Sequence, residues 1–312
     1  MIENVAVVGA GTIGGAWATL FAARGLRVTV TDPRSDAAEA VERSVRQFAP
    51  TLPEGPADAD ELLARISVEP GLEEAVAGAD LVQENGPEDL DLKRGLFDRI
   101  AAAAPEHAVL ATSTSGLMPT AIAADLPDAA AARLLVAHPF NPPHLLPLVE
   151  LVAGERTARS TVETATEFYR ALGKTPVALR KEVPGFVANR LQSAIFRECV
   201  HLVLSGVVDV AELDAIVTNS LGVRWASDGP FLSLHLGGGP GGLRHLLEHL
   251  GPGMARRWAD LGRPDLDPET VEAIGDATEH AYGDRGYPEL AEDRDRREIA
   301  VLSALAAEGA RP

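Results

Sequence analysis

Cysteine is almost absent from the sequence, since Cys199 is the only one among 312 residues. A single thiol excludes an intramolecular disulfide and a zinc site built from several cysteines. Long apolar runs are lacking too, because no stretch reaches the roughly 18–20 residues of a membrane-spanning helix. The first residues have no basic flank of the kind that precedes a signal peptide. We therefore expect a soluble, cytoplasmic protein with no membrane partner.

Positive charge is scarce as well. The chain has 28 Lys and Arg residues against 46 Asp and Glu residues, so its formal net charge is −18. This balance repels polyanions and argues against nucleic acid as a partner. A small anionic substrate would need a locally positive pocket. Hydrophobic residues make up 46% of the chain and charged residues 24%, which is ordinary globular composition and excludes long disordered regions.

Short apolar segments alternate with alanine-rich helical stretches over the first 180 residues. Several segments are continuously apolar, as are strands that are buried on both faces of a sheet. Strands separated by helices of about 10–15 residues indicate βαβ units and a parallel sheet. The expected strands are residues 5–9, 27–31, 66–68, 80–83, 108–113, 134–138, 148–152 and 175–179.

The pattern changes at residue 184, where a long helical stretch begins and strand-like segments stop. Further helical segments are expected around residues 211–221, 241–250, 268–282 and 288–308. The sequence therefore predicts two domains, one of residues 1–183 built around a sheet and one of residues 184–312 built from helices alone.

Three glycines, Gly9, Gly11 and Gly14, form the pattern G-x-G-x-x-G between the first expected strand and the first expected helix. The pattern alone is weak, but this strand–turn–helix setting is typical of a dinucleotide site. Gly9 allows the tight turn, Gly11 lets a pyrophosphate approach the backbone, and Gly14 lets helix and strand pack closely. The helix N-terminus then faces the phosphates. The sequence thus predicts an α/β, Rossmann-like dinucleotide-binding domain followed by a smaller all-helical domain.

Asp32 ends the second expected strand, 32 − 9 = 23 residues after the first glycine. A carboxylate at this place accepts hydrogen bonds from the adenosine ribose hydroxyls and repels a 2′-phosphate. The nearby Arg34 points the other way, since an arginine can receive that phosphate. We predict NAD as the cofactor, with NADP as the alternative.

A histidine and a carboxylate stand out among the later strands. His138 ends one strand, and Glu150 lies inside the apolar run 148–152, where burial is costly unless the carboxylate has a partner. A neutral imidazole can take the proton of an alcohol as hydride leaves the carbon, while a carboxylate orients the ring and stabilises the imidazolium. Polar side chains near residues 113–115 and at Asn189 would hold the reacting oxygen. This pattern favours alcohol oxidation.

Four ordered motifs carry a resemblance to a known family. The chain resembles the 3-hydroxyacyl-CoA dehydrogenase family, nearest its branch of λ-crystallin and L-gulonate 3-dehydrogenase. The resemblance covers residues 5 to about 235 and continues more loosely to the end. Its motifs, besides the glycine pattern, are STSGLM at residues 113–118, VAHPFNPPHLLPLVELV at 136–152, KEVPGFVANRLQ at 181–192 and GVRWASDGP at 222–230.

The resemblance implies a role for each matching residue. His138 would be the general base with Glu150 as its partner, and Ser115 and Asn189 would contact the reacting oxygen or the substrate. Asn141 would lie near the nicotinamide and the substrate. The residues that would contact the dinucleotide, besides the glycines, are Thr12, Ile13, Asp32, Glu88 and Lys93. The family also implies a homodimer formed through the helical domain.

The sequence departs from the acyl-CoA branch of this family after the second expected strand. That branch carries a serine and, seven residues later, a lysine that help to hold CoA. Ser44 matches the serine, but Thr51 stands at the lysine position. Arg224, within residues 222–226, offers a guanidinium that can bind a free carboxylate in bidentate fashion. Both observations favour a small free acid as the substrate.

We therefore predict an NAD-dependent dehydrogenase that oxidises the 3-hydroxyl of a free L-3-hydroxy acid of the L-gulonate kind. The alternatives are an L-3-hydroxyacyl-CoA such as 3-hydroxybutyryl-CoA, a carnitine-type acid whose cation suits an acidic protein, and a non-catalytic, crystallin-like NADH-binding protein. No metal is expected, because His245 and His249, four residues apart, have no evident third ligand.

Overall fold

The computed structural model describes residues 2–308, and the chain divides into two compact units that meet between Asn189 and Arg190. The sequence predicted a division between residues 183 and 184. The observed division falls in the first turn of helix α9 (Ala188–Leu204). Within the described residues, no helix is long and apolar enough to cross a membrane.

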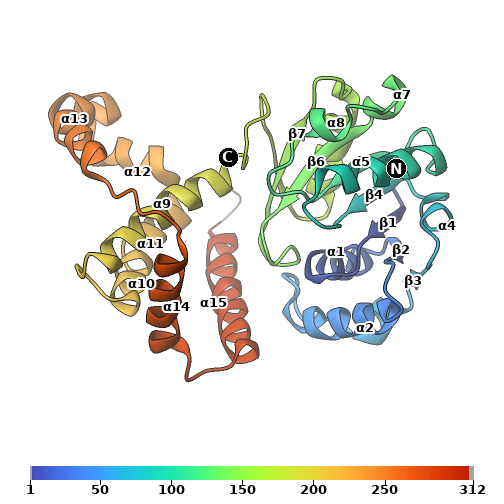
Figure 1. Ribbon diagram of the computed structural model, residues 1–312, viewed down its shortest axis with the longest axis horizontal. Helices are drawn as coiled ribbons and strands as arrows, with labels where there is room; N and C mark the ends of the chain where they lie inside the picture. Colours follow the sequence, from blue (N-terminus) through green and yellow to red (C-terminus); the bar gives the residue numbers. More distant parts are fainter. Residues whose placement is uncertain (1, 309–312) are drawn as a thin grey trace. The chain divides into compact units, whose positions relative to one another are not determined.

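The first unit is built on one sheet with the strand order β3-β2-β1-β4-β5-β6-β7-β8 (Figure 1). The order reverses between β1 and β4, and ligands of open α/β sheets bind beyond the carboxyl ends of the strands at such a point. The strands are β1 (Asn4–Val8), β2 (Arg27–Thr31), β3 (Ile66–Val68), β4 (Leu81–Glu84), β5 (Val109–Thr112), β6 (Leu134–Pro139), β7 (Leu148–Ala153) and β8 (Thr175–Ala178).

The expectation of a parallel sheet is wrong at one strand pair. β6 and β7 run antiparallel, while the other neighbouring pairs, including β7 with β8, are parallel. The cause is the connection, residues 140–147, which contains no helix. A parallel crossover needs about a dozen residues or more, so this shorter segment only allows the chain to turn back.

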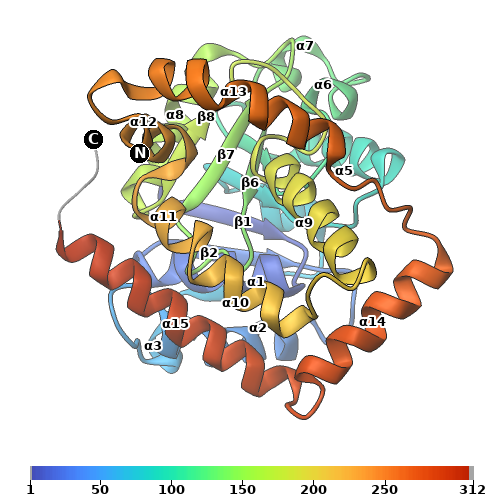
Figure 2. The ribbon, with the colours of Figure 1, turned by 90° about the vertical axis from the view of Figure 1, so that its left-hand side faces the viewer.

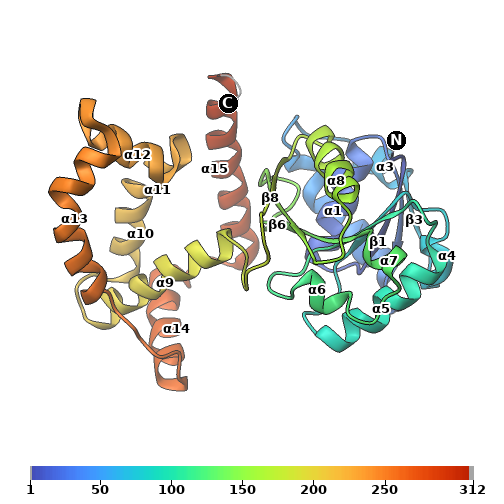
Figure 3. The same ribbon diagram turned by 90° about the horizontal axis from the view of Figure 1, so that it is seen from above.

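Helices cover both faces of the sheet (Figure 3). Along β1, Val5 and Val7 belong to one apolar cluster and Ala6 and Val8 to the other, the two-residue alternation of a strand with two buried faces. The first face is covered by α1 (Thr12–Ala23), α2 (Ala37–Phe48), α3 (Ala59–Leu63) and α8 (Arg159–Ala171). The second is covered by α4 (Leu72–Val76), α5 (Leu90–Ala103), α6 (Pro119–Ile122) and α7 (Asp128–Ala131).

The second unit consists of helices, and its described residues contain no strand (Figure 2). After α9 come α10 (Val210–Thr218), α11 (Leu221–Ser227), α12 (Gly229–Gly237), α13 (Gly242–Asp260), α14 (Pro268–Tyr282) and α15 (Tyr287–Ala307). The sequence predicted α14 with these same bounds, but it ended α13 at residue 250, ten residues early, and the observed helix continues through Pro252.

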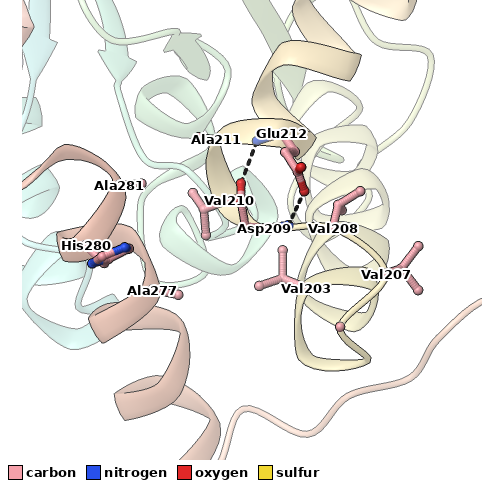
Figure 4. Close-up of a pocket in the computed structure, with 11 residues that line it drawn as sticks. Val203, Val207, Val208, Asp209, Val210, Ala211, Glu212, Ala277, His280 and Ala281 are labelled. Atoms are coloured by element: carbon pink, nitrogen blue, oxygen red, sulfur yellow. Dashed lines mark hydrogen bonds between the residues drawn. The ribbon is translucent and has the colours of Figure 1, made fainter.

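A cavity of about 570 Å³ lies within the second unit, between the turn from α9 to α10 and helix α14 (Figure 4). Its two carboxylates are already engaged. Asp209 accepts a hydrogen bond from the Glu212 backbone at 2.8 Å, and Glu212 accepts one from the Asp209 backbone at 3.0 Å. This reciprocal arrangement satisfies the first amides of α10, so we assign these acids to helix capping.

Candidate active site and cofactor cleft

A cavity of about 880 Å³ lies beyond the carboxyl ends of β1, β2 and β4. Gly9, Gly11 and Asp32 line it on one side, and Asn85 and Gly86 follow β4 on the other. It lies at the point where the strand order reverses, which is the expected place of a dinucleotide in a doubly wound sheet.

The glycines have the geometry that a bound pyrophosphate requires. Gly9 has φ +97°, a conformation that favours glycine, and a β-carbon on Gly14 would lie 1.8 Å from the Gly9 carbonyl oxygen. A β-carbon on Gly11 would meet no atom within 4 Å, so this position opens onto free space. Thr12 and Ile13 begin α1 directly behind it. The turn therefore fits a dinucleotide, whose phosphates would approach Gly11 and the amides of the first turn.

Asp32 is held at the edge of this cleft. Its carboxylate, 9% exposed, accepts hydrogen bonds from the Ala10 backbone at 2.7 Å and from Arg34 Nε at 2.8 Å. Burial would raise the pKa of this carboxyl, but the bonds from the Arg34 side chain and from the Ala10 and Arg34 amides outweigh it and hold the pKa below its ordinary value. Arg34 also donates to the Ala10 carbonyl at 3.0 Å. Arg34 thus binds the Asp32 carboxylate and the Ala10 carbonyl, and it supports the carboxylate that would accept hydrogen bonds from a ribose diol.

Replacing Asp32 by serine is expected to change cofactor preference. We expect NADH binding to weaken at least about 30-fold, because two ribose hydrogen bonds of about 1 kcal/mol each are lost. NADPH binding is expected to strengthen, because Arg34 loses its carboxylate partner and a 2′-phosphate no longer meets a negative charge. Fluorescence titration of both reduced cofactors measures this. The double variant Asp32→Ser/Arg34→Ser is the control and should lose NADH without gaining NADPH. An unchanged NADPH affinity in Asp32→Ser would contradict the assignment.

His138 and Glu150 face each other across two strands. They are direct partners in the antiparallel register of β6 and β7, and they are 4% and 2% exposed. His138 Nδ1 lies 3.1 Å from Glu150 Oε2. The pairing predicted from the sequence is therefore present, and the ladder between the strands sets its geometry.

The second carboxylate oxygen of Glu150 binds the start of α9. Oε1 accepts hydrogen bonds from the backbone amides of Val187 at 2.9 Å and Ala188 at 3.1 Å. Burial would raise the pKa of Glu150, but the His138 bond and these two amides outweigh it and lower the pKa. A carboxyl with a lowered folded pKa stabilises the fold above its unfolded pKa and loses that effect as pH falls through the folded value. Glu150 is therefore ionised at neutral pH.

Ser115 and Asn189 are in direct contact. The Asn189 amide donates to the Ser115 carbonyl at 3.2 Å, and Asn189 directly follows Ala188, whose amide binds Glu150. Glu88 accepts hydrogen bonds from the Ser115 amide at 3.1 Å and from Thr114 Oγ1 at 2.6 Å. Ser115 is thus hydrogen-bonded to Asn189, the residue after the Ala188 amide that binds Glu150, and Glu88 joins Ser115 to the loop after β4.

Lys93 lies beneath that loop. It is fully buried, and its Nζ lies 2.8 Å from both carboxylate oxygens of Glu84 and 3.1 Å from the Gly86 carbonyl. Glu84 is also buried and accepts hydrogen bonds from Thr112 and from the Gly86 amide. Lys93 therefore supports the loop whose Gly86 lines the cleft. Its direct contact with the dinucleotide stays a prediction.

Two predicted residues stand apart from these contacts. Asn141 is exposed in the loop between β6 and β7, and Arg224 is exposed on α11 of the second unit.

Sequence reasoning also missed some residues of the site. Asn85 and Gly86 line the cofactor cavity directly after β4, and their position at the carboxyl end of a buried strand was a signal that could have found them. Phe186, which contacts His138, had no signal beyond its place after Gly185.

Two family models and several known proteins match this chain. Residues 4–183 match the family model for the NAD-binding domain of 3-hydroxyacyl-CoA dehydrogenase, and residues 185–264 match the model for its C-terminal domain. An L-carnitine dehydrogenase of Streptomyces griseus is 45% identical over 303 residues, covering 97% of this chain and 90% of that protein. A 3-hydroxyacyl-CoA dehydrogenase of Gibberella moniliformis is 41% identical over 311 residues, covering 98% and 95%. The solved structure of 5-formyl-3-hydroxy-2-methylpyridine 4-carboxylic acid 5-dehydrogenase, an NAD+-dependent dismutase, has a TM-score of 0.80 and 30% identity and covers all of both chains.

Proposed function

The chain belongs to the 3-hydroxyacyl-CoA dehydrogenase family, and from this premise we propose that it is an NAD-dependent dehydrogenase that oxidises the 3-hydroxyl of L-carnitine. The observation that carries the proposal is the 45% identity to an L-carnitine dehydrogenase over 97% of the chain. The relatives thus favour the carnitine alternative over the gulonate-type acid that the sequence motifs put first. A gulonate chain also carries no cation that a protein with a net charge of −18 would attract.

The chemistry rests on the buried His138–Glu150 pair. Because Nδ1 faces the ionised Glu150, Nδ1 carries the imidazole proton and Nε2 is the free acceptor. Nε2 takes the proton of the 3-hydroxyl, and Glu150 stabilises the imidazolium that forms. Bound NAD supplies the hydride acceptor for C3. Ser115 and Asn189 hold the reacting oxygen, and Arg224 binds the substrate carboxylate.

The side chains of α2 and of the turn after it favour a free acid over CoA, because they offer no unpaired positive charge for the CoA phosphates. The Thr51 hydroxyl, at the position of the CoA lysine, lies 3.0 Å from His144 Nε2 and adds no positive charge. Arg43 and Arg46 on the same helix are each bound to carboxylates, at 3.2 Å and 2.9 Å. Ser44 packs against Gly15 of α1. The phosphates of CoA would therefore meet cations that are already neutralised.

A second candidate substrate is an L-3-hydroxyacyl-CoA. The Gibberella moniliformis relative, named a 3-hydroxyacyl-CoA dehydrogenase at 41% identity over 98% of this chain, is the observation that favours it. Both candidates share C3 oxidation by the same proton acceptor, and they differ in the groups that flank C3.

NADH formation at 340 nm distinguishes these substrates. We expect kcat/KM for L-carnitine to exceed that for L-gulonate, L-3-hydroxybutyrate and 3-hydroxybutyryl-CoA by about 100-fold or more. An analogue that lacks one of the substrate's binding groups leaves the protein groups that would bind it without a partner. L-3-Hydroxybutyrate is the matched control, because it lacks only the trimethylammonium group. Arg224→Met should raise KM for L-carnitine and leave NADH affinity unchanged. Faster turnover of the CoA ester would overturn the carnitine proposal.

A further inference from the structure

Phe186 has an unusual backbone conformation for an aromatic residue. Among residues 2–308 it is the one non-glycine residue with positive φ, at +50°, and it follows Gly185 at φ +73°. Its side chain is fully buried. Bulky residues rarely occupy this region, and where they do the surrounding structure over-determines it, often at a functional site. The contacts of Phe186 must therefore stabilise this backbone conformation.

The ring of Phe186 packs on the imidazole of His138. Their centroids are 5.3 Å apart, with the planes tilted by 54°. Phe186 also forms an apolar cluster with Val136 of β6 and Val152 of β7, the strands that carry His138 and Glu150. The ring thus packs on the face of β6 and β7 that carries the acid–base pair, where it limits rotation of the imidazole.

The backbone after Phe186 holds the other member of the pair. The amides of Val187 and Ala188, the next two residues, donate to Glu150 Oε1, while Oε2 binds His138. The turn itself is closed by a 3.0 Å hydrogen bond from the Phe186 amide to the Val183 carbonyl. The left-handed turn therefore brings the ring against His138 and the following amides against Glu150 at the same time.

We propose that Phe186 is a positioning residue, which fixes the imidazole plane through its ring and the Glu150 carboxylate through the turn it forms. The proposal rests on the proposed function only in taking His138 as the proton acceptor. In this role Phe186 itself does not touch the substrate. Removing the ring should misplace Nε2 and leave the cofactor cleft and substrate contacts in place.

The test is Phe186→Leu, which keeps apolar volume and loses the ring. We expect kcat to fall about 10- to 100-fold, since a misplacement of about 1 Å can cost a factor of 100. KM and NADH affinity should stay within about twofold, because no binding contact changes. Phe186→Gly, which adopts positive φ freely, should lose kcat as well, since the ring is gone. Phe186→Met replaces the leucine variant if that variant does not fold.

A spectroscopic measurement makes the test independent of the substrate. The Nδ1 proton of His138, assigned by its loss in His138→Gln, should give a slowly exchanging downfield signal in the wild-type protein and a weakened one in Phe186→Leu. The matched control is Phe97→Leu, which removes an equally buried ring on α5. Phe97 belongs to the apolar cluster that α4, α5, α6 and α7 cover, and not to the cluster of Phe186. This variant should lose comparable stability and keep both kcat and the signal.

Two results would overturn the proposal. One is a Phe186→Leu variant that keeps kcat within about twofold and an unchanged Nδ1 signal, because a misplaced general base must slow proton transfer. The other is an equal loss of kcat in Phe97→Leu, which would assign the effect to general destabilisation. A wild-type protein that fails to oxidise L-carnitine would refute the proposed function alone, because the variants are compared on any accepted alcohol and through the proton signal.

Discussion

Replacing His138 by glutamine is expected to lower kcat about 10³- to 10⁴-fold, at the upper end of what a general base contributes. The glutamine amide can still donate to Glu150, so the buried carboxylate keeps its partner, but an amide takes no proton from the 3-hydroxyl. NADH affinity should stay within about threefold, because none of the residues that line the cofactor cavity changes. Steady-state kinetics with the preferred alcohol and fluorescence titration of NADH measure the two effects.

The same unit contains a matched control for this variant. His107 lies 3.1 Å from Asp80, the same separation as His138 from Glu150, but its side chain is 68% exposed. His107→Gln should leave kcat unchanged, because its imidazole is exposed and neither His107 nor Asp80 lines the cofactor cavity. If His138→Gln kept more than a tenth of wild-type kcat, another group would accept the proton and the assignment of His138 would be wrong.

Replacing Lys93 by methionine is expected to lower the free energy of unfolding by about 3–5 kcal/mol, more than the other single variants. The substitution leaves Glu84 as an unpaired charge inside the protein. Glu84 and Lys93 have side-chain exposures of 0% and 1%. Denaturant unfolding measures the effect. The measurement needs a Trp225→Phe/Trp258→Phe background, in which Trp17, fully buried in the first unit, is the remaining tryptophan.

Two further variants separate the buried charge from the lost side chain. Glu84→Gln/Lys93→Met should recover most of the stability, because replacing both partners removes the unpaired charge. Arg159→Met breaks an exposed pair with Glu163 on α8 and should cost less than about 1 kcal/mol. A cost below about 1 kcal/mol for Lys93→Met would contradict this prediction.

Local patterns predicted the sheet and the glycine turn because both depend on neighbouring residues. The partnership of His138 and Glu150 was also predictable, since a carboxylate in an apolar strand requires a partner and few were available. Lys93 shows the limit. The resemblance assigned Lys93 to the dinucleotide, and no local pattern indicated Glu84 as its carboxylate partner, because the turn after β4 folds the chain back over that side chain. The turn at Phe186 likewise depends on tertiary packing that no local pattern contains, whereas the short connection at residues 140–147 could have predicted the antiparallel β7.

The reversal of direction between β6 and β7 has a consequence for how this scaffold changes over evolution. His138 and Glu150 are opposite each other in a hydrogen-bonded ladder, so a register slip of one residue in either strand would turn that strand's member of the pair to the other face and separate the two side chains. The geometry of the pair is therefore fixed by the sheet, whereas the exposed loop at Asn141 and the helices beyond Asn189 lie outside this ladder. Under the proposed function, we therefore expect a change of alcohol substrate to involve those segments and to leave the His138–Glu150 pair in place.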